Sequence, residues 1–200
     1  MPLRIAVAAG VAASLAQFLF LEYFAAPLAE SLHAALAAEG EEEYAIWAAF
    51  LAAAIAGGLW GAVFHYFAVR WGVATGALMA FAAFSLLPGL KWLPTPHGVS
   101  YAEPIWWRET VHGLYMLYNA AALWLASKWR SPIAYVLGAV ALVAGFYAFP
   151  SFTLPDRYLP YVPELRALQG LALSSWALFW ALAASLTWTL SPIRRPWRSY

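Results

Sequence analysis

Residues 88–112 read PGLKWLPTPHGVSYAEPIWWRETVH and lie between two long apolar runs. Three of its prolines fall within residues 88–96, at positions 88, 94 and 96. Because proline lacks an N–H donor and restricts the residue before it, this spacing argues against a continuous helix. Charged side chains in the stretch would be costly in hydrocarbon; they are Lys91, Glu103, Arg108 and Glu109. We therefore predict a structured loop at a membrane surface, which also carries His97 and His112.

The composition points to the same setting. Hydrophobic residues make up 64% of the 200 residues and charged residues only 10%, against roughly 25% charged in soluble domains. Apolar runs of about 18 or more residues recur, which is the length that crosses about 30 Å of hydrocarbon. The sequence predicts an all-α, polytopic membrane protein with a single transmembrane domain over residues 1–200. The net charge of +1 offers no basic patch for nucleic acid.

Several classes of chemistry have no signature in the chain. It contains no cysteine and three methionines, which excludes disulfides and thiolate ligands and disfavours a soft Cu(I) site. No phosphate-binding Gly-rich loop, zinc-protease motif or serine-hydrolase motif is present, so we predict that the chain is not an enzyme. The first apolar run reaches about Ala26 without a clear cleavage site and is interpreted as a retained helix.

Six spans are predicted, at about residues 3–26, 44–69, 72–90, 108–127, 132–149 and 167–190. An even number places both termini on one side. Seven basic residues share that side, and no acidic residue joins them: Arg4, Arg70, Lys128, Arg130, Arg194, Arg195 and Arg198. By the positive-inside rule both termini are cytoplasmic, and the protein is expected in the cell membrane. Lipid and other membrane subunits are its expected partners.

Small residues and prolines carry further expectations. Gly57 with Gly61, and Gly72 with Gly76, give helix faces where backbones can approach closely. Each outward-running helix ends near a proline, namely Pro27, Pro88 or Pro150. Three repeated hairpins would produce this pattern, although proline is common at helix ends in any case.

The central stretch resembles a motif of the CbtA family, predicted membrane subunits of a cobalt transporter. The family's stretch is similar to Pro-x-Leu-Lys-Tyr-Pro-x-x-Pro-Pro-Gly-Val, followed by an acidic residue and an Arg. The corresponding positions here are Pro88, Lys91, Pro94, Pro96, His97, Glu103 and Arg108. Trp92 stands in place of Tyr, and His97 in place of a second Pro.

Two further segments resemble the family. The segment from Pro27 to Glu30 is similar to the exit of its first helix, and Val162–Leu165 with residues 172–180 is similar to its last helix. The Arg of that last motif is not cleanly placed here. The resemblance implies a membrane subunit that handles Co²⁺.

Two carboxylate–imidazole pairs have the spacing that places both side chains on one face of a helix. They are Glu109 with His112, and Glu30 with His33 if that segment is helical. Such donors suit borderline divalent metals such as Co²⁺, Ni²⁺ or Zn²⁺. Pairing of Glu109 with Arg108 or Lys91, and a hydrogen bond from His112 to a neighbouring helix, would be the purely structural interpretation.

Glu22 lies inside the predicted first span, where an ionisable group is a functional candidate unless it reaches the interface or pairs with an Arg such as Arg108. The leading hypothesis is a divalent-metal transport subunit that gathers its ion at Glu22, Glu30, His33, Glu109 and His112. The alternative is a non-catalytic structural subunit of a larger membrane complex, suited by the 18% aromatic content.

Overall fold

The computed structural model describes residues 1–36, 46–96, 98–129 and 131–191, and every regular element in these ranges is helical. In chain order the elements are α1 (Leu3–Phe20), η1 (Leu21–Ala25), α2 (Ala26–Ala35), α3 (Ile46–Trp71), α4 (Val73–Phe81), η2 (Ala82–Leu86), α5 (Leu87–Lys91), α6 (Ile105–Trp129), α7 (Pro132–Ala148), η3 (Asp156–Tyr161) and α8 (Val162–Leu190). The segments η1 and η2 are π-helical, whereas η3 is a 3₁₀ helix.

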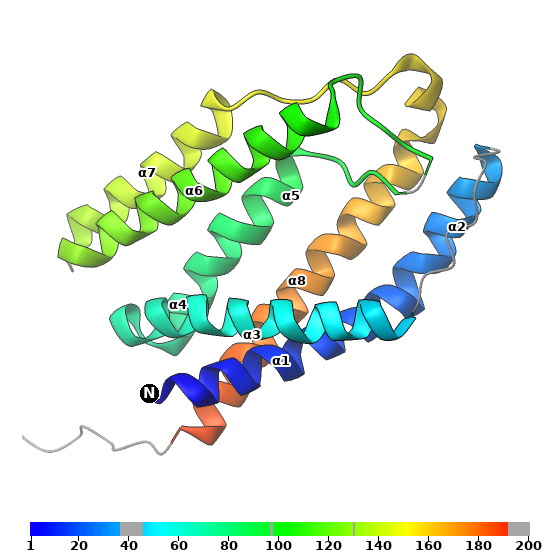
Figure 1. The fold of residues 1–200 in the computed structure, drawn as a ribbon. Helices are drawn as coiled ribbons and strands as arrows, with labels where there is room; N and C mark the ends of the chain where they lie inside the picture. Colours follow the sequence, from blue (N-terminus) through cyan, green and yellow to red (C-terminus); the bar gives the residue numbers. More distant parts are fainter. Residues whose placement is uncertain (37–45, 97, 130, 192–200) are drawn as a thin grey trace, which may run out of the picture.

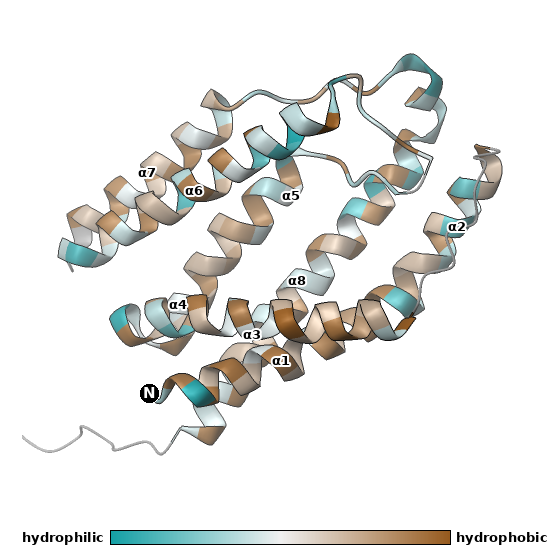
Figure 2. Ribbon diagram, viewed as in Figure 1, coloured by the Kyte–Doolittle hydropathy of each residue, from teal (hydrophilic) through white to brown (hydrophobic). Residues whose placement is uncertain are grey.

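Within the described ranges, four helical stretches are long and apolar enough to cross a membrane: Leu3–Ala35, Ile46–Trp71, Val73–Lys91 and Asp156–Leu190. A shorter apolar helix covers Ile133–Ala148. Apolar residues follow the helices, and hydrophilic residues gather mainly at helix ends and in the connecting loops (Figure 2). The all-helical class and its compatibility with a membrane therefore agree with the sequence-based prediction.

Successive long helices run in alternating directions, so that α1 begins and α8 ends at the same end of the bundle (Figure 1). We call this the terminal end. The opposite end carries the segment 92–104 between α5 and α6 and the segment 149–161 between α7 and α8 (Figure 1). We call it the loop end.

Glycine sets the closest helix contact, between α1 and α3. A Cβ on Gly57 would lie 2.5 Å from the Gly10 carbonyl oxygen, and one on Gly61 would lie 2.4 Å from the Ala6 carbonyl oxygen. The predicted Gly57–Gly61 face is confirmed. Gly76 packs against Ala68 in the same way, but Gly72 is exposed and forms the turn before α4 with φ 86°. That positive φ is the conformation that glycine adopts without strain.

Aromatic side chains fill the core where α3, η2 and α8 meet. Phe64, Phe179 and Trp180 are almost completely buried. The Trp180 Nε1–H donates to Ser85 Oγ over 2.8 Å, which supplies the indole with the partner that a buried ring needs. Trp176 packs against this cluster.

Pro88 lies inside the third helical stretch, which ends one residue beyond the predicted span of 72–90. The helix continues through Pro88 to Lys91, and only Pro94 and Pro96 belong to the loop. The reason is the π turn before it, in which Leu87 N–H donates to the Ala82 oxygen, five residues back. Pro88 has no N–H for the next carbonyl in that series, Ala83, and Asn119 Nδ2 on α6 donates to it instead, over 2.7 Å.

The same arrangement occurs once more, before Pro27. There Ala26 N–H donates to the Leu21 oxygen across η1, and the helix continues as α2 to Ala35 rather than ending at about Ala26. Pro150 lies beyond the end of α7 and follows no π turn. The three prolines therefore share a position near helix ends, but only two share a local structure.

Candidate functional site

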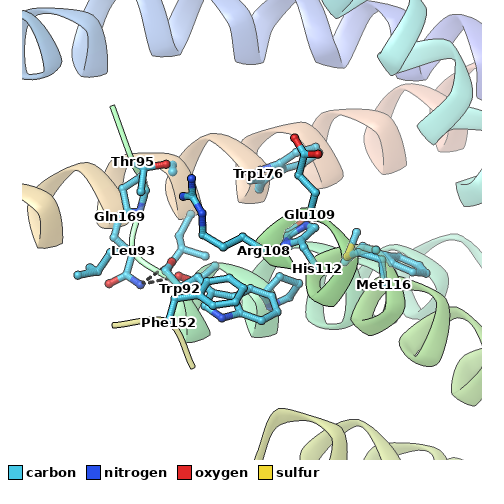
Figure 3. A pocket seen from close by; sticks show the side chains of 18 of the residues that line it. Trp92, Leu93, Thr95, Arg108, Glu109, His112, Met116, Phe152, Gln169 and Trp176 are labelled. Atoms are coloured by element: carbon cyan, nitrogen blue, oxygen red, sulfur yellow. Dashed lines mark hydrogen bonds between the residues drawn. The ribbon is translucent and has the colours of Figure 1, made fainter. Parts of the chain in front are cut away.

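A cavity of about 720 Å³ opens at the loop end of the bundle. Its walls come from η2, α5, α6 and α8, and residues 92–95 cover one side. Arg108, Glu109 and His112 from the first turns of α6 line it, with Met116 one turn further and Gln169 opposite (Figure 3). Polar groups from α6 thus face a cavity whose other walls are largely aromatic and aliphatic.

Trp92 fixes one wall of this cavity. Its ring is buried, stacks on Phe152 with centroids 5.2 Å apart, and meets the Tyr115 ring edge-on at 5.3 Å. The centroids of the His112 and Trp92 rings lie 5.2 Å apart. The Trp92 Nε1–H donates to the Pro150 oxygen over 3.3 Å. The imidazole therefore has a rigid aromatic neighbour that holds the first turns of α6 against the loop.

The two loops at this end are joined by hydrogen bonds. Ala102 N–H donates to the Thr153 oxygen, and Thr153 N–H donates in turn to the Glu103 carboxylate, each over about 3.0 Å. Tyr158 O–H donates to the Gly98 oxygen over 2.9 Å. Glu103 therefore ties segment 92–104 to segment 149–161.

These contacts act on two pKa values. Partial desolvation opposes ionisation of Glu103, but the hydrogen bonds from Thr153 and the nearby Arg108 charge outweigh it and lower the pKa of Glu103 below its usual range. Burial raises the pKa of Tyr101, whose hydroxyl donates to the Leu93 oxygen over 2.9 Å. Near neutral pH the loop end therefore holds Glu103 ionised and Tyr101 neutral.

Gln169 is a site residue that the sequence reasoning missed. Its Nε2 group donates to the Gly89 carbonyl and lies 3.4 Å from the Trp92 carbonyl, so it satisfies the end of α5. Arg166 Nη1 donates to Gln169 Oε1 over 2.8 Å and fixes the orientation of the amide. The sequence did carry a signal for Gln169, since it is an amide within an apolar helix and lies three residues after Arg166.

Within the part of the chain that the structure describes, Lys91 and Arg108 form no ion pair with a carboxylate. Lys91 donates to the Phe146 oxygen and lies 5.0 Å from the centre of that ring. Arg108 lies 5.7 Å from the Tyr101 ring centre, and its Nη2 is 3.5 Å from Ser100 Oγ. Among the described residues Arg108 forms no ion pair, and its Nε is buried without a hydrogen-bond partner.

The five predicted metal ligands lie in different places. Glu109 and His112 are exposed and line the cavity. Glu22 is exposed on η1, whereas Glu30 and His33 lie on α2, which is helical as their spacing required. None of these three lines the cavity. His97 and the acidic residues 39 and 41–43 fall outside the described residues.

Within the described ranges, no group of three or more His, Asp or Glu side chains is placed to hold a metal ion. No protein-family model, no curated protein and no solved structure matches the chain.

The chemistry of the site is that of a single carboxylate–imidazole pair on a cavity wall. Glu109 and His112 are one helical turn apart, and the Met116 thioether follows one turn later. Two protein donors leave most of the coordination sphere of a divalent ion to water. On these two donors alone, a divalent ion would be held weakly.

Proposed function

We propose that this chain is a CbtA-like membrane subunit of a divalent-metal transport system, with Co²⁺ as its expected cargo. The observation that carries the proposal is that Glu109 and His112 face one cavity at the loop end. The loop motifs that resemble the CbtA family surround the same cavity, since Pro88, Pro94 and Arg108 also line it. The ion would enter at the loop end and meet this pair first.

The proposed topology has six spans and two cytoplasmic termini. Four helices already have the length and composition of a span. The proposal adds α6 and α7, which run between the same two ends of the bundle (Figure 1). The loop end would then face away from the cytoplasm, where an imported or exported ion meets the bulk solvent.

The test compares two matched double variants in cells that express the protein with its partner subunits. Glu109→Gln/His112→Asn removes both donors from the cavity. Glu30→Gln/His33→Asn removes a pair of the same spacing on α2, which does not line it. Loss of even a supporting group at a metal site costs about 10–100-fold in metal affinity or activity. We therefore expect Co²⁺ uptake to fall about tenfold or more in the first variant and to stay unchanged in the second.

Equal uptake in the two variants and the unaltered protein would overturn the proposal. Because Glu109 and His112 are exposed, their replacement should leave folding intact. Chromatography of each variant in detergent checks this directly.

A second candidate is a structural subunit of a larger membrane complex. It is favoured by α7, which packs on α6 and reaches α5 only near Lys91, so most of its apolar surface is uncovered. Extraction in a gentle detergent separates the two functions. Stable co-migration with several other subunits, together with normal Co²⁺ uptake in the Glu109→Gln/His112→Asn variant, would favour the structural role.

A further inference from the structure

An apolar groove continues the cavity toward the terminal end. It encloses about 930 Å³ between α3, η2 and α6. Trp60, Phe84, Gly113 and Met116 line both hollows, so the two are continuous. Along α6 the combined groove extends from Arg108 to Trp124, which at 1.5 Å per residue is about 24 Å.

The lining of the groove changes from charged at the loop end to apolar toward the terminal end. The loop end presents Arg108, Glu109 and His112, whereas the Gln169 amide is already hydrogen-bonded to Arg166 and to the Gly89 carbonyl. The remainder is lined by apolar side chains together with Tyr66, whose hydroxyl is already within hydrogen-bond distance of Ser127 Oγ, at 3.2 Å. A ligand that matches this surface has a charged head and a long apolar chain, as a membrane lipid has.

The charges define the head group more closely. Arg108 and Glu109 are consecutive, yet their side chains extend in different directions from α6 (Figure 3). Arg108 forms no ion pair among the described residues and keeps a buried Nε–H without an acceptor. Carboxylate and phosphate oxygens are the acceptors that match a guanidinium best, and phosphate is the one that a membrane lipid with a polar head group carries. The Glu109 carboxylate beside it favours a head group that also carries a hydrogen-bonding cation.

We propose that this groove binds an aminophospholipid. Its phosphate lies on Arg108, its primary ammonium lies on Glu109, and one acyl chain follows α6 toward Trp124. The proposal is independent of metal transport, because it needs only the opposite charges of Arg108 and Glu109 and the apolar groove. A metal ion on Glu109 would displace the ammonium group, so the lipid belongs to the metal-free state.

The experiment uses the full chain purified in a mild detergent with a chelator present, so that metal does not compete. It is mixed with equal amounts of phosphatidylethanolamine, phosphatidylglycerol and phosphatidylcholine that carry the same acyl chains. Native mass spectrometry then counts the lipids retained. A charge-assisted hydrogen bond corresponds to about tenfold or more in affinity. We expect phosphatidylethanolamine to exceed both other lipids by about that factor.

Two pairs of variants test the two halves of the ligand. Arg108→Gln should lower retention about tenfold, whereas Lys128→Gln, at the other end of α6, should not. Gly113→Leu places a side chain in the groove, since nothing lies within 4 Å of a Cβ there. Gly170→Leu is the control, because its Cβ position is equally open but does not line either hollow. Only Gly113→Leu should lower retention.

Glu109→Gln should remove the preference for phosphatidylethanolamine over phosphatidylglycerol while lipid is still retained. Equal retention of the three lipids by the unaltered protein would overturn the proposal, as would equal retention by the Gly113→Leu and Gly170→Leu variants. Because this measurement contains no metal, its failure leaves the Co²⁺ uptake result unaffected.

Discussion

At the scale of single residues, Asn119 supplies the hydrogen-bond donor that Pro88 lacks. The fully buried amide reaches from α6 to the Ala83 carbonyl in the π turn before Pro88. Without that bond a buried carbonyl would have no partner, which costs about 1–3 kcal/mol. One polar side chain thus joins two helices and allows a third segment, α5, to continue past a proline.

This relation predicts a coupled pair of substitutions. Asn119→Leu should lower the free energy of unfolding by about 1–3 kcal/mol. The same substitution in a Pro88→Ala background should cost less, because the new backbone N–H can donate to the carbonyl that Asn119 leaves. The measurement is a double-mutant cycle by SDS titration, followed by circular dichroism. A coupling of about 0.5 kcal/mol or more is expected, and strict additivity would contradict the interpretation.

Glu103 predicts a dependence of stability on pH. Its pKa is lowered in the folded protein from an ordinary value of 4.5. The ionised carboxylate therefore stabilises the fold above that value, and the stabilisation is lost as pH falls through the lower folded pKa. The temperature of unfolding should fall on acidification below about pH 4.5, by up to about 2–4 °C from this group.

The comparison of Glu103→Gln with Glu30→Gln checks this assignment. The first variant should lose part of the acid-dependent decline, because the Thr153–carboxylate bond no longer titrates. The second removes an exposed carboxylate on α2 and should keep the decline. Identical pH profiles for both variants would show that the loop-end bond contributes nothing measurable.

The sequence predicted the two polar residues of the site, but not the residues that contact them. The spacing of Glu109 and His112 correctly placed both on one helical face. In the sequence, Trp92 is notable only as the residue that stands in place of the family's Tyr, although in the structure it is the buried contact of His112. Its stacking partner, Phe152, lies far away in the chain, and no local pattern specifies such a pair.

At the scale of elements, the contact between α1 and α3 gives the sharpest prediction. Gly57→Val should destabilise the protein by about 1–3 kcal/mol or more, because the new Cβ would meet Ser14 Cβ and the Gly10 backbone, neither of which can turn aside by a side-chain rotation. Gly113→Ala on α6 is the control, since nothing lies within 4 Å of its Cβ position. It should be neutral or stabilising by about 0.5–1 kcal/mol. SDS titration measures both, and equal effects would contradict the packing argument.

The apolar runs predicted where the helices lie and, for most of them, where they end. The boundaries of α4 to α5 and of α7 agree closely with the predicted spans. The exception is the first span, which continues through a π turn and Pro27 to Ala35 instead of ending at about Ala26. At Pro88 the predicted span already continued past the proline, and the structure adds the reason, a π turn whose Ala83 carbonyl accepts from Asn119.

At the scale of the whole molecule, the proposed orientation can be tested by chemical labelling. The chain contains no cysteine, so a single introduced thiol is the only one present. Ser151→Cys lies in the exposed loop-end segment, and Trp129→Cys lies at the exposed end of α6 toward the terminal end. A membrane-impermeant maleimide should label the first in intact cells and the second only after permeabilisation. The reverse pattern would place the termini outside.

The prediction that acidic and imidazole side chains share one site came from the topology of the spans. Topology specifies only at which end of the bundle a residue lies, not which residues face one another. Glu22, Glu30 and His33 lie on η1 and α2, away from the cavity that Glu109 and His112 line. Which residues share a cavity depends on how each helix is rotated about its axis. The apolar runs are nearly uniform around the helix, so they specify that rotation poorly.

The two π turns change which side of the helix the residues after them face. Each places one additional residue within a turn, so side chains beyond it are rotated by about 100° relative to an uninterrupted α-helix. If regular α-helical periodicity is applied across residues 82–86, it therefore places Lys91 on the wrong face of the helix. Deleting one residue there would restore regular α-helical winding and leave Lys91 facing the Phe146 carbonyl, because the π turn already absorbs the extra residue. The contact between α5 and the α6–α7 hairpin should therefore survive such a deletion, whereas a deletion elsewhere in α4 that keeps the π turn would rotate Lys91 away from it.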